Sequence, residues 1–231
     1  MNEQNQSEPL PNRLSRDEIH RIIKGKVHRI DREFTEAFEF IDKYEKSVTF
    51  FGSARFTEDN DHYKKALWLA RKISELGYTI LTGGGGGIME AANRGAFEVG
   101  RPSVGLNIRL PQRQPLNLYT TDSVQFDYFF VRKVALSFAA EAYLFFPGGF
   151  GTLDEFFEIL TLIQTHKIRR VPIILVGCDY WNELNKFVKN AILDKHHSIN
   201  AADMELYMIT DDDEEILEVI KKAPVRPMIQ K

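Results

Sequence analysis

The amino-acid sequence predicts an α/β protein with a Rossmann-like, doubly wound parallel sheet, helices on both faces and an extra N-terminal helix segment. Apolar strand-like runs alternate with helical stretches from residue 46 onward, a pattern typical of a parallel sheet covered on both faces. Two glycine-rich stretches each lie between a predicted strand and the helix that follows it. The length of 231 residues suits one such domain with a short appendage.

The composition argues against several other classes of protein. Hydrophobic residues make up 43% and charged residues 27% of the chain, as in ordinary globular proteins. The net charge of −3 gives no general attraction to nucleic acid or acidic membranes, so neither is expected as a partner. We find no apolar run of membrane-spanning length, and the polar N-terminus leads us to expect no secretory signal. A single cysteine, Cys178, suits a reducing compartment, so we expect a cytoplasmic protein.

The chain begins with a polar stretch, residues 1–14, that we expect to be disordered. Ser15 and Glu18 then have the spacing of a capping box, which predicts the start of a helix. Apolar residues follow at intervals of three and four and form one helical face, with a break near Gly25 or Asp31 left open. This face must pack on the domain that follows or on a second subunit. Its members are Ile19, Ile22, Ile23, Val27, Ile30, Phe34, Phe38 and Ile41.

The predicted elements divide the chain into three parts. Residues 1–45 form a tail with the helical extension, residues 46–223 form the Rossmann-like domain, and residues 224–231 form a second tail. The strands are expected at 46–51, 78–82, 102–107, 123–127, 142–146 and 171–176. The helices of the domain are expected at 61–76, 88–99, 129–140, 152–164, 180–193 and 211–223.

The first glycine-rich stretch is a run of five glycines between the second predicted strand and its helix. Such a run is costly in chain entropy, so a backbone that must approach a ligand explains it better than a simple turn. Gly84, Gly85 and Gly86 are therefore candidate phosphate-binding residues. Ser53, in the loop after the first strand, either donates to a phosphate or hydroxyl or serves only to turn the chain.

The second stretch follows the apolar strand at residues 142–146. Its glycines Gly148, Gly149 and Gly151 remove side-chain bulk, so that a ligand can come close to the backbone. Thr152 is expected as the N-cap of the next helix. Because a helix N-terminus offers free N–H donors and a positive dipole end, this loop predicts a phosphate site.

Two carboxylates, Asp154 and Glu155, are expected in the first turn of that helix. Beside a phosphate cradle, they suggest chemistry on the neighbouring sugar of a phosphorylated substrate. A structural explanation is equally open, because Thr152 and Glu155 also have the spacing of a capping box.

Arg132 and Lys133 are charges within an otherwise apolar and aromatic helix. Such side chains pair with a buried carboxylate or an anionic ligand, or they extend to the surface and pair with an acid there. Both glycine loops should open at the carboxyl edge of one parallel sheet. We therefore expect one cleft with two glycine-rich walls, with Arg132 and Glu155 nearby.

Several common sites are absent from the sequence. There is no G-x-G-x-x-G dinucleotide fingerprint, no G-x-x-x-x-G-K-[ST] P-loop and no G-x-S-x-G elbow. The ligand is therefore expected to be a mononucleotide or sugar phosphate. His196 and His197 lack neighbouring ligands at metal-binding spacing, so no metal site is expected, and no cofactor is predicted.

Residues 147–155 match the pattern P-G-G-x-G-T-x-x-E, and Arg132-Lys133 and the segment 82–96 accompany it. With these motifs the sequence resembles the LOG family of cytokinin riboside 5′-monophosphate phosphoribohydrolases over residues 46–193. The resemblance implies a homodimer that hydrolyses the N-glycosidic bond of a purine nucleoside 5′-monophosphate, releasing free base and ribose 5-phosphate. It also implies catalytic roles for Arg132 and Glu155. Substrate and phosphate contacts are implied for Lys133, Thr152 and the glycines of its loop.

Two departures leave the substrate open. Phe129, Phe130 and Val131 precede Arg132, where plant-type members usually have a methionine and polar residues. The N-terminal helix is additional to compact members, which weakens the case for cytokinin activation and makes general nucleotide salvage, as by an AMP nucleosidase, plausible. One rival is a non-catalytic nucleotide-binding or sensing module that uses the same loops. The other is an amino-acid decarboxylase, which needs pyridoxal phosphate on a lysine, and Lys133 is the candidate.

Overall fold

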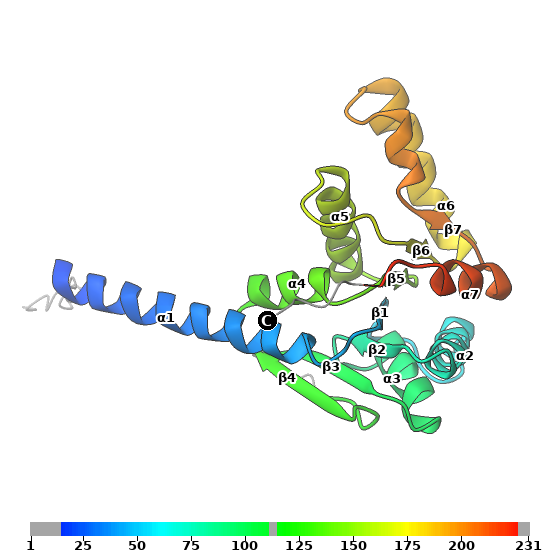
Figure 1. The fold of residues 1–231 in the computed structure, drawn as a ribbon. Helices are drawn as coiled ribbons and strands as arrows, with labels where there is room; N and C mark the ends of the chain where they lie inside the picture. The colour runs from blue at the N-terminus through cyan, green and yellow to red at the C-terminus, as the bar shows by residue number, and fades with distance from the viewer. Residues whose placement is uncertain (1–14, 111–114, 226–231) are drawn as a thin grey trace, which may run out of the picture.

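The computed structural model describes residues 15–110 and 115–225 (Figure 1). Within them, seven strands form one parallel sheet in the order β4-β3-β2-β1-β5-β6-β7. This confirms the predicted Rossmann-like α/β class. The strands are β1 Ser47–Phe51, β2 Thr79–Thr82, β3 Ser103–Ile108, β4 Asp122–Phe126, β5 Ala142–Phe145, β6 Ile173–Leu175 and β7 Met208–Ile209. The sequence did not predict β7, because two residues carry no periodic signal. The stretch 1–14, expected to be disordered, lies outside the described residues.

The order of the strands reverses between β1 and β5. From β1 the chain moves outward through β2 and β3 to β4, and then returns to place β5 on the other side of β1. Phe51 and Phe145 are register partners at the ends of these two strands. The N–H of Ser53 donates to the carbonyl of Pro147 at 3.0 Å, so the loops after β1 and β5 lie side by side. In open α/β sheets this reversal is where ligands bind.

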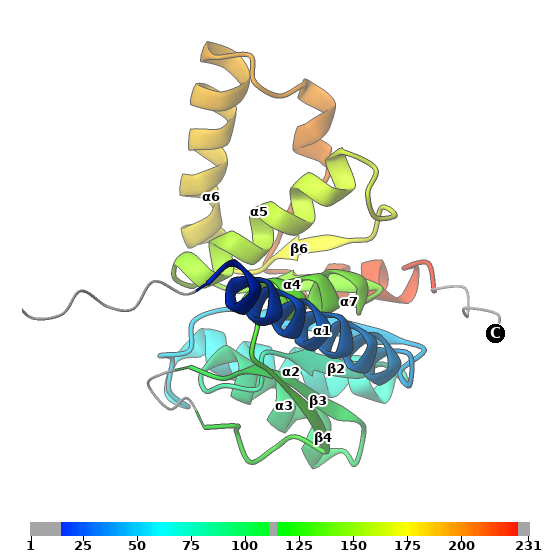
Figure 2. The same ribbon diagram turned by 90° about the vertical axis from the view of Figure 1, so that its left-hand side faces the viewer.

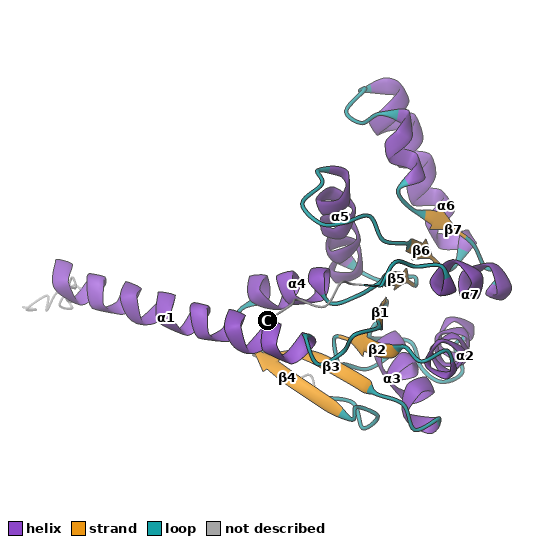
Figure 3. Ribbon diagram, viewed as in Figure 1, coloured by secondary structure: helices purple, strands orange, loops and turns teal. Residues whose placement is uncertain are grey.

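Helices cover both faces of the sheet (Figure 3). One buried cluster joins the sheet to α1, α4, α5 and α6, and the other joins it to α2, α3 and α7. The helices are α1 Arg16–Ile41, α2 Asp61–Glu75, α3 Ile88–Glu98, α4 Phe129–Phe138, α5 Phe150–Gln164, α6 Cys178–Phe187 and α7 Asp213–Lys221. A π-helix, η1 Val188–Lys195, continues α6, and a 3₁₀ helix, η2 Ala201–Glu205, follows it. Among the described residues, we find no helix with the length and hydrophobicity that crossing a membrane requires.

Helix α1 confirms its predicted start. The hydroxyl of Ser15 accepts from the N–H of Glu18, and the Glu18 carboxylate accepts from the N–H of Ser15 at 2.8 Å. The helix is continuous through Gly25. Its C-terminal part, with Ala37 and Phe40 buried, packs on the domain that follows. Its N-terminal part projects away from the sheet (Figures 1 and 2).

Helix α5 corrects one prediction. It begins at Phe150 with Gly149 as its N-cap, and no side chain caps it. Thr152 is therefore the third helical residue, whose N–H donates to the carbonyl of Gly149 at 3.0 Å. The predicted N-cap role of Thr152 and the capping box with Glu155 are wrong. Asp154 and Glu155 also lie beyond the first turn, which contains no acidic residue. The physical reason is that Gly149 can serve as N-cap in extended conformation, which lets the helix start one turn earlier.

Candidate functional site

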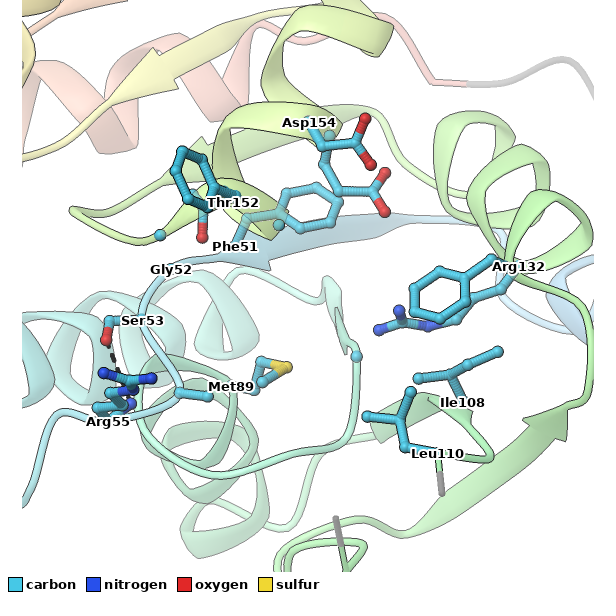
Figure 4. Close-up of a pocket in the computed structure, with 17 residues that line it drawn as sticks. Phe51, Gly52, Ser53, Arg55, Met89, Ile108, Leu110, Arg132, Thr152 and Asp154 are labelled. Carbon is cyan, nitrogen blue, oxygen red and sulfur yellow. Dashed lines mark hydrogen bonds between the residues drawn. The ribbon is translucent and has the colours of Figure 1, made fainter. Parts of the chain in front are cut away.

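A cavity of about 670 Å³ opens at the carboxyl edge of the sheet, beside the loops that follow β1 and β5 (Figure 4). The loops after β1, β2 and β5 contribute to its wall, as do the end of β3 and the first turns of α4 and α5. It is large enough for a mononucleotide. The lining residues are Phe51, Gly52, Ser53, Ala54, Arg55, Gly83, Met89, Ile108, Leu110, Phe129, Arg132, Gly149, Phe150, Gly151, Thr152, Asp154 and Glu155.

The loop after β1 forms one side of the cavity. A Cβ at Gly52 would lie 2.7 Å from the side chain of Ile88, so only glycine lets this loop pack on α3. The carbonyl of Ser53 accepts from the N–H of Ile88 at 3.0 Å, which ties the loop to the start of that helix. Ser53 and the exposed Arg55 line the cavity, with the Ser53 hydroxyl accepting from the N–H of Arg55 at 3.2 Å. Both side chains are placed to meet a polar ligand.

The start of α5 forms a second side. Gly149, Gly151 and Thr152 line the cavity. The first N–H groups of a helix have no partner within it, and no side chain caps them here, so they can bind an anion. Gly148 lies outside the lining residues, and a Cβ there would overlap the hydroxyl of Thr152. Gly148 therefore lets the Thr152 side chain fold back over the loop.

Glu155 is buried, with 7% of its surface exposed, and it lines the cavity. Its Oε2 atom has no hydrogen-bond partner among the described residues. Burial raises the pKa of Glu155 to about 7, although the positive charges of Arg132 and Lys133 oppose this shift. A buried carboxylate with an unused oxygen is costly in a folded protein, and such groups occur at sites that bind or react.

Arg132 extends from α4 into the cavity. Its Nε donates to the carbonyl of Leu106 at 2.7 Å, which fixes the guanidinium against the end of β3. A Cβ at Gly83 would overlap Nη2 of Arg132, so this glycine makes room for the guanidinium. Burial lowers the pKa of Arg132 and the charge of Glu155 raises it, but an arginine stays charged in proteins. Arg132 and Glu155 form no ion pair within 4 Å in the described part of the chain, which leaves both free to meet a ligand.

Lys133 lies outside the cavity lining and holds α4 against α5. Its Nζ lies 2.8 Å from Asp154 and 2.9 Å from Glu158. Burial lowers the pKa of Lys133, but the hydrogen bonds to these carboxylates outweigh that effect and raise it. A contact between Lys133 and the substrate therefore stays a prediction. The two ion pairs hold Lys133 near Glu155, where its positive charge lowers the pKa of that carboxyl.

The run of five glycines enters the cavity only at Gly83. Gly84 has a φ of +72°, which favours glycine, and its carbonyl accepts from the N–H of Asn117 at 2.8 Å. The carbonyl of Gly85 accepts from the side-chain amide of Asn117 at 3.0 Å. Part of the glycine run therefore packs against the neighbouring loop that carries Asn117, which is a structural reason for these glycines. A phosphate contact at Gly84, Gly85 or Gly86 stays a prediction.

The apolar part of the cavity wall was not predicted from the sequence. Phe129 is 53% exposed and Phe150 is 93% exposed, and both lie on the cavity. Met89 and Leu110 add further apolar surface. One signal was present in the sequence, because Phe129 precedes Arg132 by three residues and shares its side of a helix. Exposed aromatic rings beside the half-buried Arg132 and the buried Glu155 suit a ligand with a flat base and an ionic group.

The sequence model of a family described as "Possible lysine decarboxylase" matches residues 89–220. The chain is 26% identical over 153 residues to the probable cytokinin riboside 5′-monophosphate phosphoribohydrolase LOGL3 of Oryza sativa subsp. japonica. This match covers 65% of this chain and 72% of that protein. The chain is also 26% identical over 153 residues to the cytokinin riboside 5′-monophosphate phosphoribohydrolase LOG7 of Arabidopsis thaliana, covering 65% of this chain and 70% of that protein.

Solved structures share the fold at lower identity. A molybdenum cofactor binding protein from Rippkaea orientalis has a TM-score of 0.58 at 20% identity, over 77% of this chain and 96% of that chain. The molybdenum cofactor carrier protein from Chlamydomonas reinhardtii has a TM-score of 0.56 at 21% identity, over 77% of this chain and 98% of that chain. At these identities the likeness concerns the fold alone.

Proposed function

This chain belongs to the family described as possible lysine decarboxylase, and on that premise we propose that it is a nucleoside 5′-monophosphate phosphoribohydrolase. It hydrolyses the N-glycosidic bond of a purine nucleotide, with or without an N6 substituent, to free base and ribose 5-phosphate. The observation that carries the proposal is Glu155, a buried cavity carboxylate with an unpaired oxygen and a pKa of about 7. The curated relatives named for this reaction support it.

The cavity offers a place for each part of the substrate. The 5′-phosphate binds at the start of α5, where Thr152 and the uncapped N–H groups meet it, with Ser53 and Arg55 on the neighbouring loop. The base lies against the apolar and aromatic wall that Phe129 and Phe150 provide. The ribose then lies between them, within reach of Glu155. Binding energy from the remote phosphate positions the sugar for reaction.

The chemistry needs a carboxylate at this place. The bond from C1′ to the base nitrogen breaks, and its electron pair leaves with the base, which gains a proton. Positive charge develops on the ribose, and ionised Glu155 stabilises it, as carboxylates do in other glycosidic cleavages. Water adds to C1′ and loses a proton, which Glu155 can accept because its pKa lies near neutrality. Arg132 keeps part of the Glu155 population ionised by lowering its pKa.

The activity in the family's description is not the one we propose. Decarboxylation with pyridoxal phosphate would use a lysine amine in its neutral form. Lys133 is paired with Asp154 and Glu158, and its raised pKa keeps the amine charged. Lys133 also lies outside the cavity lining. Both features argue against it as the site of a covalent cofactor.

We propose further that the protein is a homodimer in the cytoplasm and that its partner is a purine nucleoside monophosphate. It binds no nucleic acid or membrane in this proposal, and it needs no cofactor. Its single cysteine, Cys178, suits a reducing compartment.

Product analysis tests the proposal. The purified protein is incubated with AMP, GMP, CMP and an N6-substituted AMP, and free base and ribose 5-phosphate are measured by chromatography. We expect base release from a purine nucleotide and a loss of about 10² or more in Glu155→Gln, the scale for a preorganised electrostatic group. Glu218→Gln, an exposed carboxylate of α7, is the matched control and should keep full activity. Nucleotide binding with no release by the unaltered protein would instead favour the binding or sensing module.

A further inference from the structure

A tyrosine on α6 holds the glycine loop that joins β5 to α5. The hydroxyl of Tyr180 donates to the carbonyl of Gly148 at 2.8 Å. Tyr180 is half-buried, and neither it nor Gly148 is among the residues that line the cavity. The contact is therefore made on the loop outside the cavity, next to the place where α5 begins.

This hydrogen bond fixes the direction of the peptide unit between Gly148 and Gly149. The peptide bonds of the described chain are trans, so the carbonyl of Gly148 and the N–H of Gly149 point in opposite directions. The carbonyl points to Tyr180. The N–H of Gly149 therefore points away from Tyr180, and Gly149 itself lines the cavity.

Three consecutive N–H groups at the start of α5 are free to bind a ligand. In the described part of the chain, those of Gly149, Phe150 and Gly151 donate to no other protein atom. Such a series of free donors at a helix N-terminus is suited to a phosphate. The carbonyl of Gly149 accepts from the N–H of Thr152 at 3.0 Å, so the helix itself sets the direction of the Phe150 N–H. The peptide unit before it lies outside the helix and has Tyr180 as its anchor.

A peptide unit between two glycines needs such an anchor. Because neither residue has a Cβ, rotation of the unit by about half a turn meets little steric resistance from its own side chains. The preceding carbonyl, of Pro147, is already held by the N–H of Ser53 at 3.0 Å, which leaves the Gly148–Gly149 unit as the one to be fixed. In the rotated form, the partial negative charge of the Gly148 carbonyl would face the phosphate and repel it.

Helix α6 is itself held firmly enough to serve as the anchor. The indole N–H of Trp181 donates to the carbonyl of Phe145 at 3.0 Å, which ties α6 to the end of β5. The carboxylate of Asp211 accepts from the N–H of Gly177 at 2.7 Å, which ties the start of α6 to the loop after β7. Trp181 is fully buried beside Tyr180. The position of the Tyr180 ring is therefore set by the core and not by the glycine loop.

We propose, resting on the phosphate placement of the proposed function, that Tyr180 is a positioning residue for phosphate binding. Its hydroxyl holds the carbonyl of Gly148, so that the N–H of Gly149 points into the cavity and donates to the 5′-phosphate. Tyr180 acts through the glycine loop and does not touch the substrate.

Titration calorimetry with ribose 5-phosphate tests the role of the hydroxyl. Tyr180→Phe keeps the ring and removes the hydrogen bond, so the Kd for ribose 5-phosphate should rise about tenfold or more, the scale for a lost hydrogen bond to a charged group. Tyr207→Phe is the matched control, because Tyr207 is also half-buried and its hydroxyl donates to Oδ1 of Asn185 at 2.7 Å, away from the cavity lining. It should leave the Kd unchanged. An unchanged Kd in Tyr180→Phe would overturn the proposal.

Magnetic resonance of the backbone amides distinguishes positioning from a general loosening of the loop. In the unaltered protein, saturation with ribose 5-phosphate should move the amide protons of Gly149, Phe150 and Gly151 downfield, because each donates to the phosphate. In Tyr180→Phe at saturation, the Gly149 shift should be lost while the other two remain. Loss of all three shifts, or of none, would refute the role of Tyr180.

The same measurements separate this role from the proposed reaction. If the unaltered protein does not bind ribose 5-phosphate, the phosphate placement and the role of Tyr180 are both wrong. If it binds ribose 5-phosphate with the expected effect of Tyr180→Phe but releases no base from any nucleotide, the proposed hydrolysis alone is wrong.

Discussion

Replacement of Glu155 by glutamine should stabilise the folded protein at neutral and alkaline pH while it removes activity. Burial raises the pKa of Glu155 from 4.5 to about 7, so folding favours the protonated carboxyl. The stability that this group contributes is fully present below pH 4.5 and is lost as the pH rises through 7. At 1.36 kcal/mol per pH unit, the pKa difference corresponds to about 3.4 kcal/mol above pH 8. Glutamine has nearly the same shape but cannot ionise.

Urea unfolding at several pH values measures this effect. The difference in unfolding free energy between Glu155→Gln and the unaltered protein should grow by about 2.5 kcal/mol from pH 5 to pH 8. Most of this growth in the difference should occur between pH 5 and pH 7. Glu218→Gln is the control, because its carboxylate is exposed and paired with Lys221, and this variant should gain no stability over the same range. A stability difference for Glu155→Gln that does not change with pH would refute the burial argument.

Three further substitutions test the walls of the cavity. Gly83→Ala places a methyl group against Nη2 of Arg132 and within 2.8 Å of the Met89 sulfur, so kcat should fall at least tenfold, as steady-state kinetics would show. Arg132→Met removes the charge that lowers the pKa of Glu155, so turnover should fall by about 10² and the acid limb of kcat/KM should move to higher pH. An unmoved limb would contradict that coupling. Thr152→Val keeps the shape but loses the hydroxyl, so KM for the nucleotide should rise with little change in Tm. An unchanged KM would remove Thr152 from the phosphate site.

The sequence predicted the charged residues of the site better than its glycines. Arg132 and Glu155 are conspicuous because one is a charge in an apolar helix and the other follows a glycine loop. Both line the cavity. Among Gly83 to Gly87, however, the sequence singled out the three central residues, while Gly83 lines the cavity. Which glycine meets a ligand depends on loops far away in the chain, such as the one that carries Asn117. Spacing along the chain cannot give that contact.

The capping prediction at Thr152 failed for a related reason. Threonine followed three residues later by glutamate has the local pattern of a capping box, and the same pattern was correct at Ser15 and Glu18. At Ser15 the helix end is exposed, so local hydrogen bonds decide it. At α5 the loop is packed between the end of β1 and the side chain of Thr152, and the helix starts earlier at Phe150. Tertiary packing therefore decided this boundary.

The sequence by itself determined the alternation of strands and helices, the parallel sheet and the two charged residues of the site, because these depend on periodicity and local chemistry. Only the tertiary structure placed the loops after β1 and β5 side by side at the reversal of strand order. Only the tertiary structure also buried Glu155 without a partner for Oε2 and raised its pKa to about 7. The burial of a side chain and the electric field at it depend on neighbours from the whole chain. Helix and strand propensity and the period of apolar residues depend on only a few consecutive residues, so the sequence shows them directly.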